Sequence, residues 1–126
     1  MKIISWNIRG LNGAHKQEII RNMIRDQRPN ILMIRETKMK KESLGNISFS
    51  NNMSGEASSF EGVSGGFLTL FNNKQFKFNT FYNDGNIIFC KVFHLYSNDI
   101  YFLLNVYDQN SKRERNNYWS KICDMV

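Results

Sequence analysis

The fold is decided by one stretch of the sequence, Pro29-Asn30-Ile31-Leu32-Met33-Ile34-Arg35-Glu36-Thr37-Lys38. Its four consecutive apolar residues, 31–34, form a run that is short enough for a strand buried in a sheet. Pro29 and Asn30 end the helical pattern that comes before the run, because proline disrupts a continuing helix. The predicted strand therefore presents Arg35, Glu36 and Thr37 at its carboxyl end.

The sequence before this stretch predicts a strand, a turn and a helix. Residues 2–8 are rich in β-branched and aromatic residues, which favours a strand. Residues 9–13 contain two glycines, which supply the freedom that a turn needs. Residues 14–27 predict a helix with a basic outer face. Its apolar positions recur at offsets of three and four residues: Ile19, Ile20, Met23 and Ile24.

The sequence after it predicts a polar loop from Lys38 to Gly65, then a run of antiparallel strands. The expected strands are 67–71, 76–81, 87–93 and 100–107. Asn83-Asp84-Gly85-Asn86 is a strong hairpin turn, and residues 111–125 resemble a helix that Ser111 and Glu114 cap. The order predicts a mixed α and β architecture in which a sheet carries helices on one face.

Length and composition bound the protein class. The 126 residues suffice for one domain, and no apolar run approaches the ~20 residues that span a bilayer. The N-terminal residues lack the apolar stretch of a signal peptide. Two cysteines, Cys90 and Cys123, are too few for a disulfide scaffold, so we expect a reducing compartment, nuclear or cytoplasmic.

The positive charge is concentrated in the first third of the chain. Residues 1–41 contain ten basic and three acidic side chains, whereas residues 42–126 contain seven and eight. A cationic surface suits a polyanionic partner, since lysine and arginine release counterions from phosphates. An ordinary solvated basic surface explains the same count equally well.

Three polar residues follow predicted strands: Asn7, Glu36 and Tyr107. Side chains at neighbouring strand ends converge on one rim of a sheet, where ligands commonly bind. A carboxylate there suits Mg2+, which takes oxygen ligands and polarises phosphate oxygens. Each residue also has a simpler interpretation: Asn7 forms a turn, Glu36 is a solvated acid beside lysines, and Tyr107 belongs to the core.

The remaining candidates for chemistry are weaker. His15 and His94 are interpreted as a helix-surface residue and a strand residue, and neither has the neighbours of a ligand. Cys90 and Cys123 are interpreted as ordinary core or surface residues.

Four strings occur in a characteristic order: residues 3–11, Ile-Ile-Ser-Trp-Asn-Ile-Arg-Gly-Leu; the stretch 29–38; Gly65-Gly66-Phe67-Leu68; and Asn105-Val106-Tyr107. Together they closely resemble the start of the endonuclease/exonuclease/phosphatase family. Within this family, they resemble the apurinic-endonuclease-like domains of plant LINE-type retrotransposon polyproteins. The resemblance implies a DNase I-like α/β sandwich, an α+β fold with two sheets and four layers, of which this chain is the N-terminal half.

The resemblance also implies an activity. Members of the family hydrolyse phosphodiesters with Mg2+ or Mn2+. The implied partner is therefore DNA, and no association with a membrane is expected. Asn7 and Glu36 match residues at the metal and phosphate site, and Tyr107 matches the tyrosine that touches the scissile phosphate. The implied chemistry is attack by water, assisted by the metal, with an aspartate from later in the domain as base.

The sequence departs from the family pattern in three places. Arg35 stands where the family has glutamine, and Tyr107-Asp108-Gln109-Asn110 lacks the usual glycine and proline. The Gly-Asp-x-Asn and Ser-Asp-His segments are absent, since Asp84-Gly85-Asn86 lies in a turn before the tyrosine strand. We therefore expect residues 1–126 to be a partial domain that is truncated before those segments and inactive alone.

Two other functions stay open. One keeps the family and changes the substrate, giving a phosphatase or a phospholipid-type hydrolase. The other is a non-catalytic nucleic-acid-binding remnant that keeps half a sandwich and a basic face. Half a sandwich is also expected to leave apolar surface and a strand edge uncovered, which favours aggregation.

Overall fold

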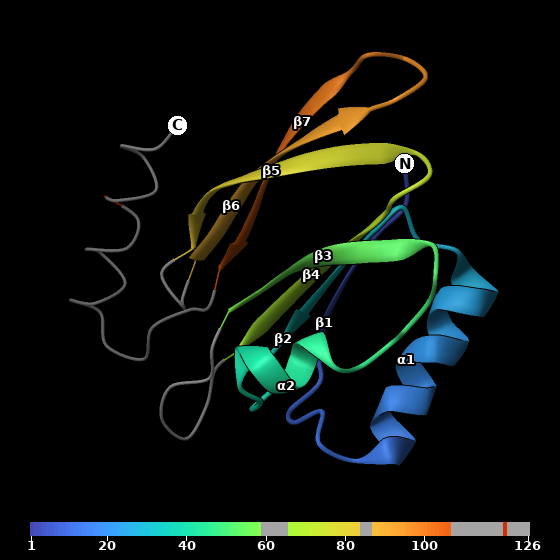
Figure 1. Cartoon of the computed structure of the whole chain (residues 1–126), viewed down its shortest axis with the longest axis vertical. Coiled ribbons are helices and arrows are strands. Elements are labelled where there is room, and N and C mark those ends of the chain that lie inside the picture. Colours follow the sequence, from blue (N-terminus) through green and yellow to red (C-terminus); the bar gives the residue numbers. More distant parts are fainter. Residues whose placement is uncertain (59–65, 84–86, 107–119, 121–126) are drawn as a thin grey trace.

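The computed structural model describes residues 1–58, 66–83, 87–106 and Ser120. The elements follow in the order β1 (Ile3–Asn7), α1 (Ala14–Gln27), β2 (Ile31–Arg35), α2 (Lys41–Gly45), β3 (Met53–Ser58), β4 (Phe67–Asn72), β5 (Phe76–Asn83), β6 (Ile87–His94) and β7 (Ile100–Val106). The strands form two sheets (Figure 1). The mixed architecture expected from the sequence is confirmed.

The first sheet has the strand order β1-β2-β4-β3. β1 and β2 are parallel, with Asn7 opposite Arg35, and they are joined through α1. β4 pairs antiparallel with both β2 and β3. The parallel pair therefore ends at one edge of this sheet, with the carboxyl ends of β1 and β2 side by side.

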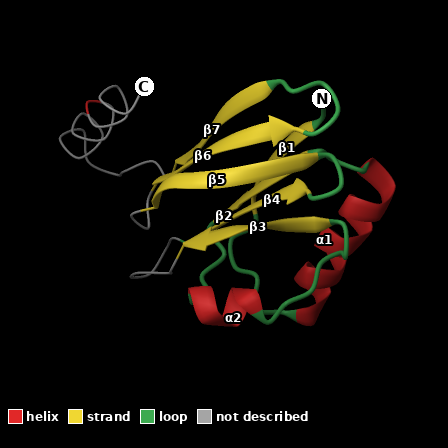
Figure 2. Ribbon diagram, turned by 45° about the horizontal axis from the view of Figure 1, so that its top comes forward, coloured by secondary structure: helices red, strands yellow, loops and turns green. Residues whose placement is uncertain are grey.

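The second sheet contains β5, β6 and β7, which pair antiparallel in chain order. It packs against one face of the first sheet, and α1 and α2 lie on the opposite face (Figure 2). The core between the sheets consists of Ile31, Phe71, Phe76, Cys90 and Val92. The described helices thus cover one face of the first sheet, as expected, and a second sheet covers its other face.

The core under α1 follows from the apolar spacing of the helix. Ile20 and Ile24 are the buried helix residues, and they pack with Leu32 and Ile34 of β2. α1 has the expected bounds, and it ends at Arg28, whose backbone has a left-handed φ of 47°. Arg28 N–H still donates to Ile24 O at 3.0 Å, which closes the last turn.

The prediction of a polar loop between Lys38 and Gly65 is wrong, because α2 and β3 lie in this segment. β3 has the sequence Met-Ser-Gly-Glu-Ala-Ser, with no β-branched or aromatic residue. Its strand conformation comes from pairing with β4. A Cβ atom at Gly55 would collide with Thr69 O, so glycine permits this close backbone approach.

A buried hydrogen bond joins the two sheets. Asn105 Nδ2 in β7 donates to Thr69 Oγ1 in β4 at 3.1 Å, and both residues are buried. Asn105 continues the inward face of β7 that Tyr101 and Leu103 begin. A buried amide needs such a partner, so this pair fixes how β7 sits over β4.

Cys90 lies in the core between the sheets, where only 1% of its surface is exposed. Burial, and secondarily the charge of Glu56, raise the pKa of its thiol to about 11. The thiol is therefore protonated at neutral pH, which suits a core residue and not a nucleophile. The interpretation of Cys90 as an ordinary residue is confirmed, whereas Cys123 lies outside the described residues.

Three further predictions also lie outside the described residues. They are the hairpin turn at residues 84–86, Tyr107 and, apart from Ser120, the helix 111–125. In the described part of the chain, no helix is both long enough and apolar enough to cross a membrane.

The Thr69–Asn105 hydrogen bond can be tested by a double-mutant cycle. Thr69→Val keeps the shape of the side chain but leaves the Asn105 amide unpaired, so we expect it to lower the free energy of unfolding by about 1–3 kcal/mol. Thr69→Val combined with Asn105→Leu should cost less than the sum of the single changes. Urea unfolding of the four proteins measures the coupling, and strict additivity contradicts it.

Candidate active site at the strand ends

Asn7 and Glu36 lie at the same edge of the first sheet. Asn7 is the last residue of β1, and Glu36 directly follows Arg35, the register partner of Asn7 in β2. Because β1 and β2 are parallel, both side chains occur where the strands end together (Figure 1). The structure thus brings together two of the three residues that the sequence singled out.

The loops after β1 and β2 continue alongside each other beyond the sheet. Gly10 N–H donates to Glu36 O at 2.7 Å, and Leu11 N–H donates to Thr37 O at 2.9 Å. Lys16 Nζ donates to Ile8 O and to Arg9 O at 3.0 and 3.1 Å. These bonds hold the backbone at Glu36 in place, and the role of Lys16 has no signal in the sequence.

Left-handed backbone conformations gather at this edge. Arg9, Glu36 and Lys38 have φ values of 55°, 56° and 53°, and Gly10 and Gly66 also have positive φ. Such values cost a residue with a Cβ atom about 1–2 kcal/mol. Strain of this kind persists where surrounding contacts impose it, and it concentrates at functional sites.

The Asn7 side chain forms a turn, which is the simpler of its two interpretations. Arg9 N–H donates to Asn7 Oδ1 at 3.2 Å, the pattern of an Asx turn. Asn7 is nevertheless exposed, and its amide oxygen keeps a second lone pair. The turn therefore orients the side chain without consuming its capacity as a ligand.

Glu36 and Arg35 are two of the charged side chains at this edge. Glu36 is half-buried and, within the described part of the chain, forms no ion pair. Arg35 Nε is buried and has no hydrogen-bond partner among the described residues. An unpaired buried guanidinium nitrogen favours an incoming anion.

The donor set suits a hard divalent cation that is completed by waters and a phosphate. Glu36 offers a carboxylate and Asn7 an amide oxygen, and Mg2+ commonly uses one or two carboxylates together with water and substrate oxygens. Among residues 1–58, 66–83, 87–106 and 120, no three His, Cys, Asp or Glu side chains cluster around a common point. These residues therefore do not supply a complete set of protein ligands for a metal ion.

Thr37 and Gly66 join the segment that carries Glu36 to the start of β4. Thr37 is fully buried, and its N–H donates to Gly66 O at 3.1 Å. A Cβ atom at Gly66 would collide with Thr37 Oγ1, and the φ of Gly66 is 86°. Only glycine therefore fits where β4 begins beside the segment that carries Glu36.

The other candidates lie elsewhere. Tyr107 is outside the described residues, although β7, which precedes it, runs toward the same side of the molecule as β2 in both ribbon views (Figures 1 and 2). His15 is an exposed residue of α1, as expected. His94 ends β6, where its Nδ1 accepts a hydrogen bond from Ser97 N–H at 3.0 Å within a hairpin.

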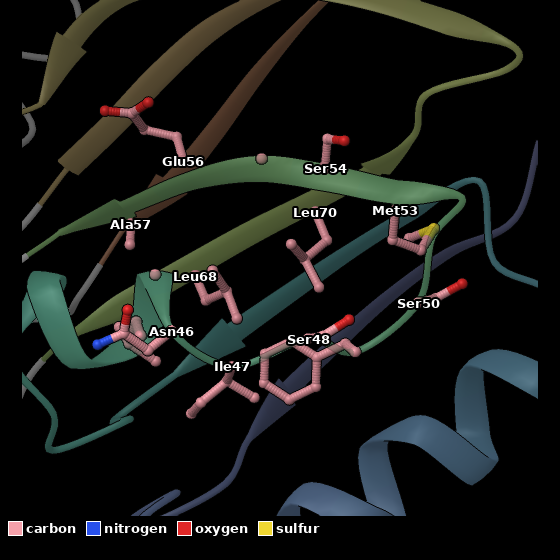
Figure 3. A pocket seen from close by; sticks show the side chains of 14 residues that line it. Asn46, Ile47, Ser48, Ser50, Met53, Ser54, Glu56, Ala57, Leu68 and Leu70 are labelled. Carbon is pink, nitrogen blue, oxygen red and sulfur yellow. The ribbon is translucent and has the colours of Figure 1, made fainter.

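A separate hollow of about 470 Å³ lies between β3 and the segment 44–50. Figure 3 shows Ile47, Leu68 and Leu70 beneath β3 on the side of the hollow, whereas Glu56 and Ser54 project from the other face of the strand. The side chains beneath β3 continue the core under the helices. Both apolar and polar residues line this hollow, and neither Asn7 nor Glu36 is among them.

No protein-family model matches the sequence, and no curated protein sequence matches it. The structure is similar to several solved structures. An AP endonuclease from Leishmania major has a TM-score of 0.68 and 20% identity, over 93% of this chain and 43% of that one. The endonuclease domain of TRAS1, a telomere-specific non-LTR retrotransposon, has a TM-score of 0.71 and 11% identity, over 99% and 53%.

A 3'-5' exonuclease from Neisseria meningitidis is also similar, with a TM-score of 0.64 and 16% identity, over 98% of this chain and 50% of that one. The chain therefore has the DNase I-like fold of endonucleases, exonucleases and phosphatases, as the sequence resemblance implies. It spans about half the length of the solved structures that it matches.

The anchoring role of Gly66 predicts an asymmetry between two glycines. We expect Gly66→Ala to lower the free energy of unfolding by at least about 2 kcal/mol, because it adds backbone strain and a clash with Thr37. Gly45→Ala is the matched control, since a Cβ atom there meets nothing within 4 Å. This change should leave the free energy of unfolding unchanged. Urea unfolding compares them, and equal effects contradict the anchoring role.

Proposed function

We propose that this chain supplies the metal- and phosphate-binding part of a Mg2+- or Mn2+-dependent phosphodiesterase that acts on DNA. The observation that carries the proposal is that Asn7 and Glu36 lie at the same edge of the sheet, where β1 and β2 end, with Glu36 on backbone held in a left-handed conformation. The fold adds support, since the similar structures include an AP endonuclease, a retrotransposon endonuclease domain and an exonuclease. The whole protein is proposed to be a nicking endonuclease of a LINE-type element, working in the nucleus or cytoplasm.

Each side chain has one task in this proposal. Glu36 and Asn7 hold the cation with their oxygens, and Arg35 attracts the phosphate through its unpaired Nε. Tyr107 is proposed to contact the same phosphate, as the family resemblance implies. When bound, the cation would polarise a phosphate oxygen and offset charge on the leaving group.

The chain alone is proposed to be inactive. Among the described residues no three His, Cys, Asp or Glu side chains cluster around Glu36, and neither Gly-Asp-x-Asn nor Ser-Asp-His occurs in the sequence. Without a second acid, no side chain here is suited to take the proton from an attacking water. Catalytic groups act as a unit, so the remaining ones do not rescue the rate.

The second candidate function is nucleic-acid binding without catalysis. The observation that favours it is the concentration of positive charge in residues 1–41, which includes α1 and the loops at the edge.

The metal site is tested by Glu36→Gln. We expect this change to weaken Mn2+ binding by at least about ten-fold, because it removes the carboxylate. Water-proton relaxation enhancement measures the affinity, and Glu42→Gln, an exposed acid in α2, is the control with the same charge change.

Nicking of supercoiled plasmid is then measured for the unchanged chain, where we expect none. Equal Mn2+ affinity in all three proteins contradicts the metal site. Nicking that depends on metal and disappears in Glu36→Gln contradicts the inactivity while supporting the site.

Arg35 is tested by opposing effects on stability and binding. Arg35→Met removes the unpaired buried Nε, so we expect the free energy of unfolding to rise by about 1–3 kcal/mol. The same change should weaken binding of a short DNA duplex by about ten-fold, because a charge-assisted hydrogen bond to phosphate is lost. Loss of stability in urea unfolding, or unchanged affinity in fluorescence anisotropy, contradicts a phosphate-binding role.

A further inference from the structure

A second hollow, of about 550 Å³, lies at the other end of the first sheet. Three arginines of the α1 region line it: Arg21, Arg25 and Arg28. Its floor and walls also include Ile24, Pro29, Phe49 and Met53, with polar groups from Ser50, Asn52 and Asn72. No acidic residue lines it, so the surface combines guanidinium groups with apolar and aromatic area.

The arginines lie together because of their spacing. Positions 21, 25 and 28 are separated by four and three residues, which places them on one stripe of a helix. Ile20 and Ile24 are buried against the sheet, so the arginine stripe runs beside the buried one. The segment 49–53 closes the hollow from the other side.

Arg21 is already held in position. Its Nε donates to Ser48 O at 2.9 Å, and its guanidinium carbon lies 6.0 Å from the centre of the Phe49 ring. The terminal nitrogens of a guanidinium remain free to donate when only Nε is used. Little side-chain entropy would therefore be lost when a ligand binds to Arg21.

Arg28 occupies a position where arginine is unfavourable for the fold. It ends α1 with φ 47°, and glycine or asparagine is the usual residue in this conformation. Within the described part of the chain, its side chain has no ion pair. A residue that strains the backbone without a partner satisfies some need other than stability.

The opposing charges are smaller than the arginine charge. Asp26 pairs with Arg25 at 3.0 Å, and the carboxyl end of α1 contributes about half a negative charge. Three guanidinium groups outweigh both, so the hollow attracts anions. Phosphates suit guanidinium geometry, since it donates two parallel hydrogen bonds.

We propose that this hollow binds single-stranded nucleic acid, with backbone phosphates on Arg25 and Arg28 and one base against the apolar wall at Phe49. A surface that offers arginines alone would suit any polyanion, whereas an adjoining apolar and aromatic wall suits an unpaired base. The bases of a duplex are stacked inside it and do not reach such a wall.

The hollow is distinct from the candidate active site. It lies near Pro29, before β2, and near Asn72, at the end of β4, whereas Asn7 and Glu36 follow β1 and β2. The five residues of β2 separate the two places by roughly 17 Å. Binding here therefore does not depend on the proposed phosphodiesterase function, and either can fail without the other.

The experiment measures fluorescence anisotropy of a labelled single-stranded oligonucleotide with the 126-residue chain, in EDTA, across a salt series. We expect Arg25→Ala and Arg28→Gly each to weaken binding by about ten-fold and to reduce the salt slope by about one. Arg28→Gly also relieves the backbone strain, so its melting temperature should not fall, which separates lost binding from lost folding. Lys77→Ala, an exposed base in β5, is the control for charge and should retain affinity.

The same measurement with other nucleic acids and with heparin identifies the ligand. DNA and RNA strands of the same sequence tell which sugar is preferred, and either preference agrees with the proposal. Glu36→Gln should bind like the unchanged chain, and a duplex or heparin should bind more weakly than the single strand. The proposal is overturned if Arg28→Gly binds like the unchanged chain, if Lys77→Ala loses as much affinity, or if heparin competes as well as the single strand.

Discussion

The burial of β2 on both of its faces is the constraint on which the rest of the structure depends. Ile31 and Met33 face the second sheet, whereas Leu32 and Ile34 face α1. A strand with no solvent face needs a cover on each side and a hydrogen-bonding partner on each edge. α1 and the second sheet supply the covers, and β1 and β4 supply the edges. Each of these elements is thus placed by the same five residues.

This constraint also explains why polar chemistry concentrates beyond the end of β2. The chain leaves the interior only after Ile34, so Arg35 and Glu36 are the first charged side chains of the strand near solvent. The left-handed conformation at Glu36 and the hydrogen bonds from the loop after β1 then fix the backbone conformation of this segment. The edge is organised before any ligand binds, because core packing has already fixed the strand that carries it.

Much of this could be predicted from the sequence where the signal is local. The spacing of Ile20 and Ile24 defines α1, and the positions of Asn7 and Glu36 just after predicted strands were enough to predict that they share an edge. β3 could not be predicted, because its strand conformation depends on β4 and on the missing side chain of Gly55. The hollow beside Arg28 could not be predicted from the sequence either, because its far wall is the segment 49–53, which shows no periodic pattern.

The two sheets differ in how far apart along the chain their partners lie. β5, β6 and β7 pair with immediate neighbours, whereas β2 pairs with β4 across α2 and β3. Strands joined by short hairpins meet quickly, and long-range pairs form slowly because loop closure costs entropy before contacts repay it. The second sheet is therefore expected to assemble first and to act as the surface on which β2 and β4 collapse. The hydrogen bond between Asn105 of β7 and Thr69 of β4 would then form after β7 has paired with β6.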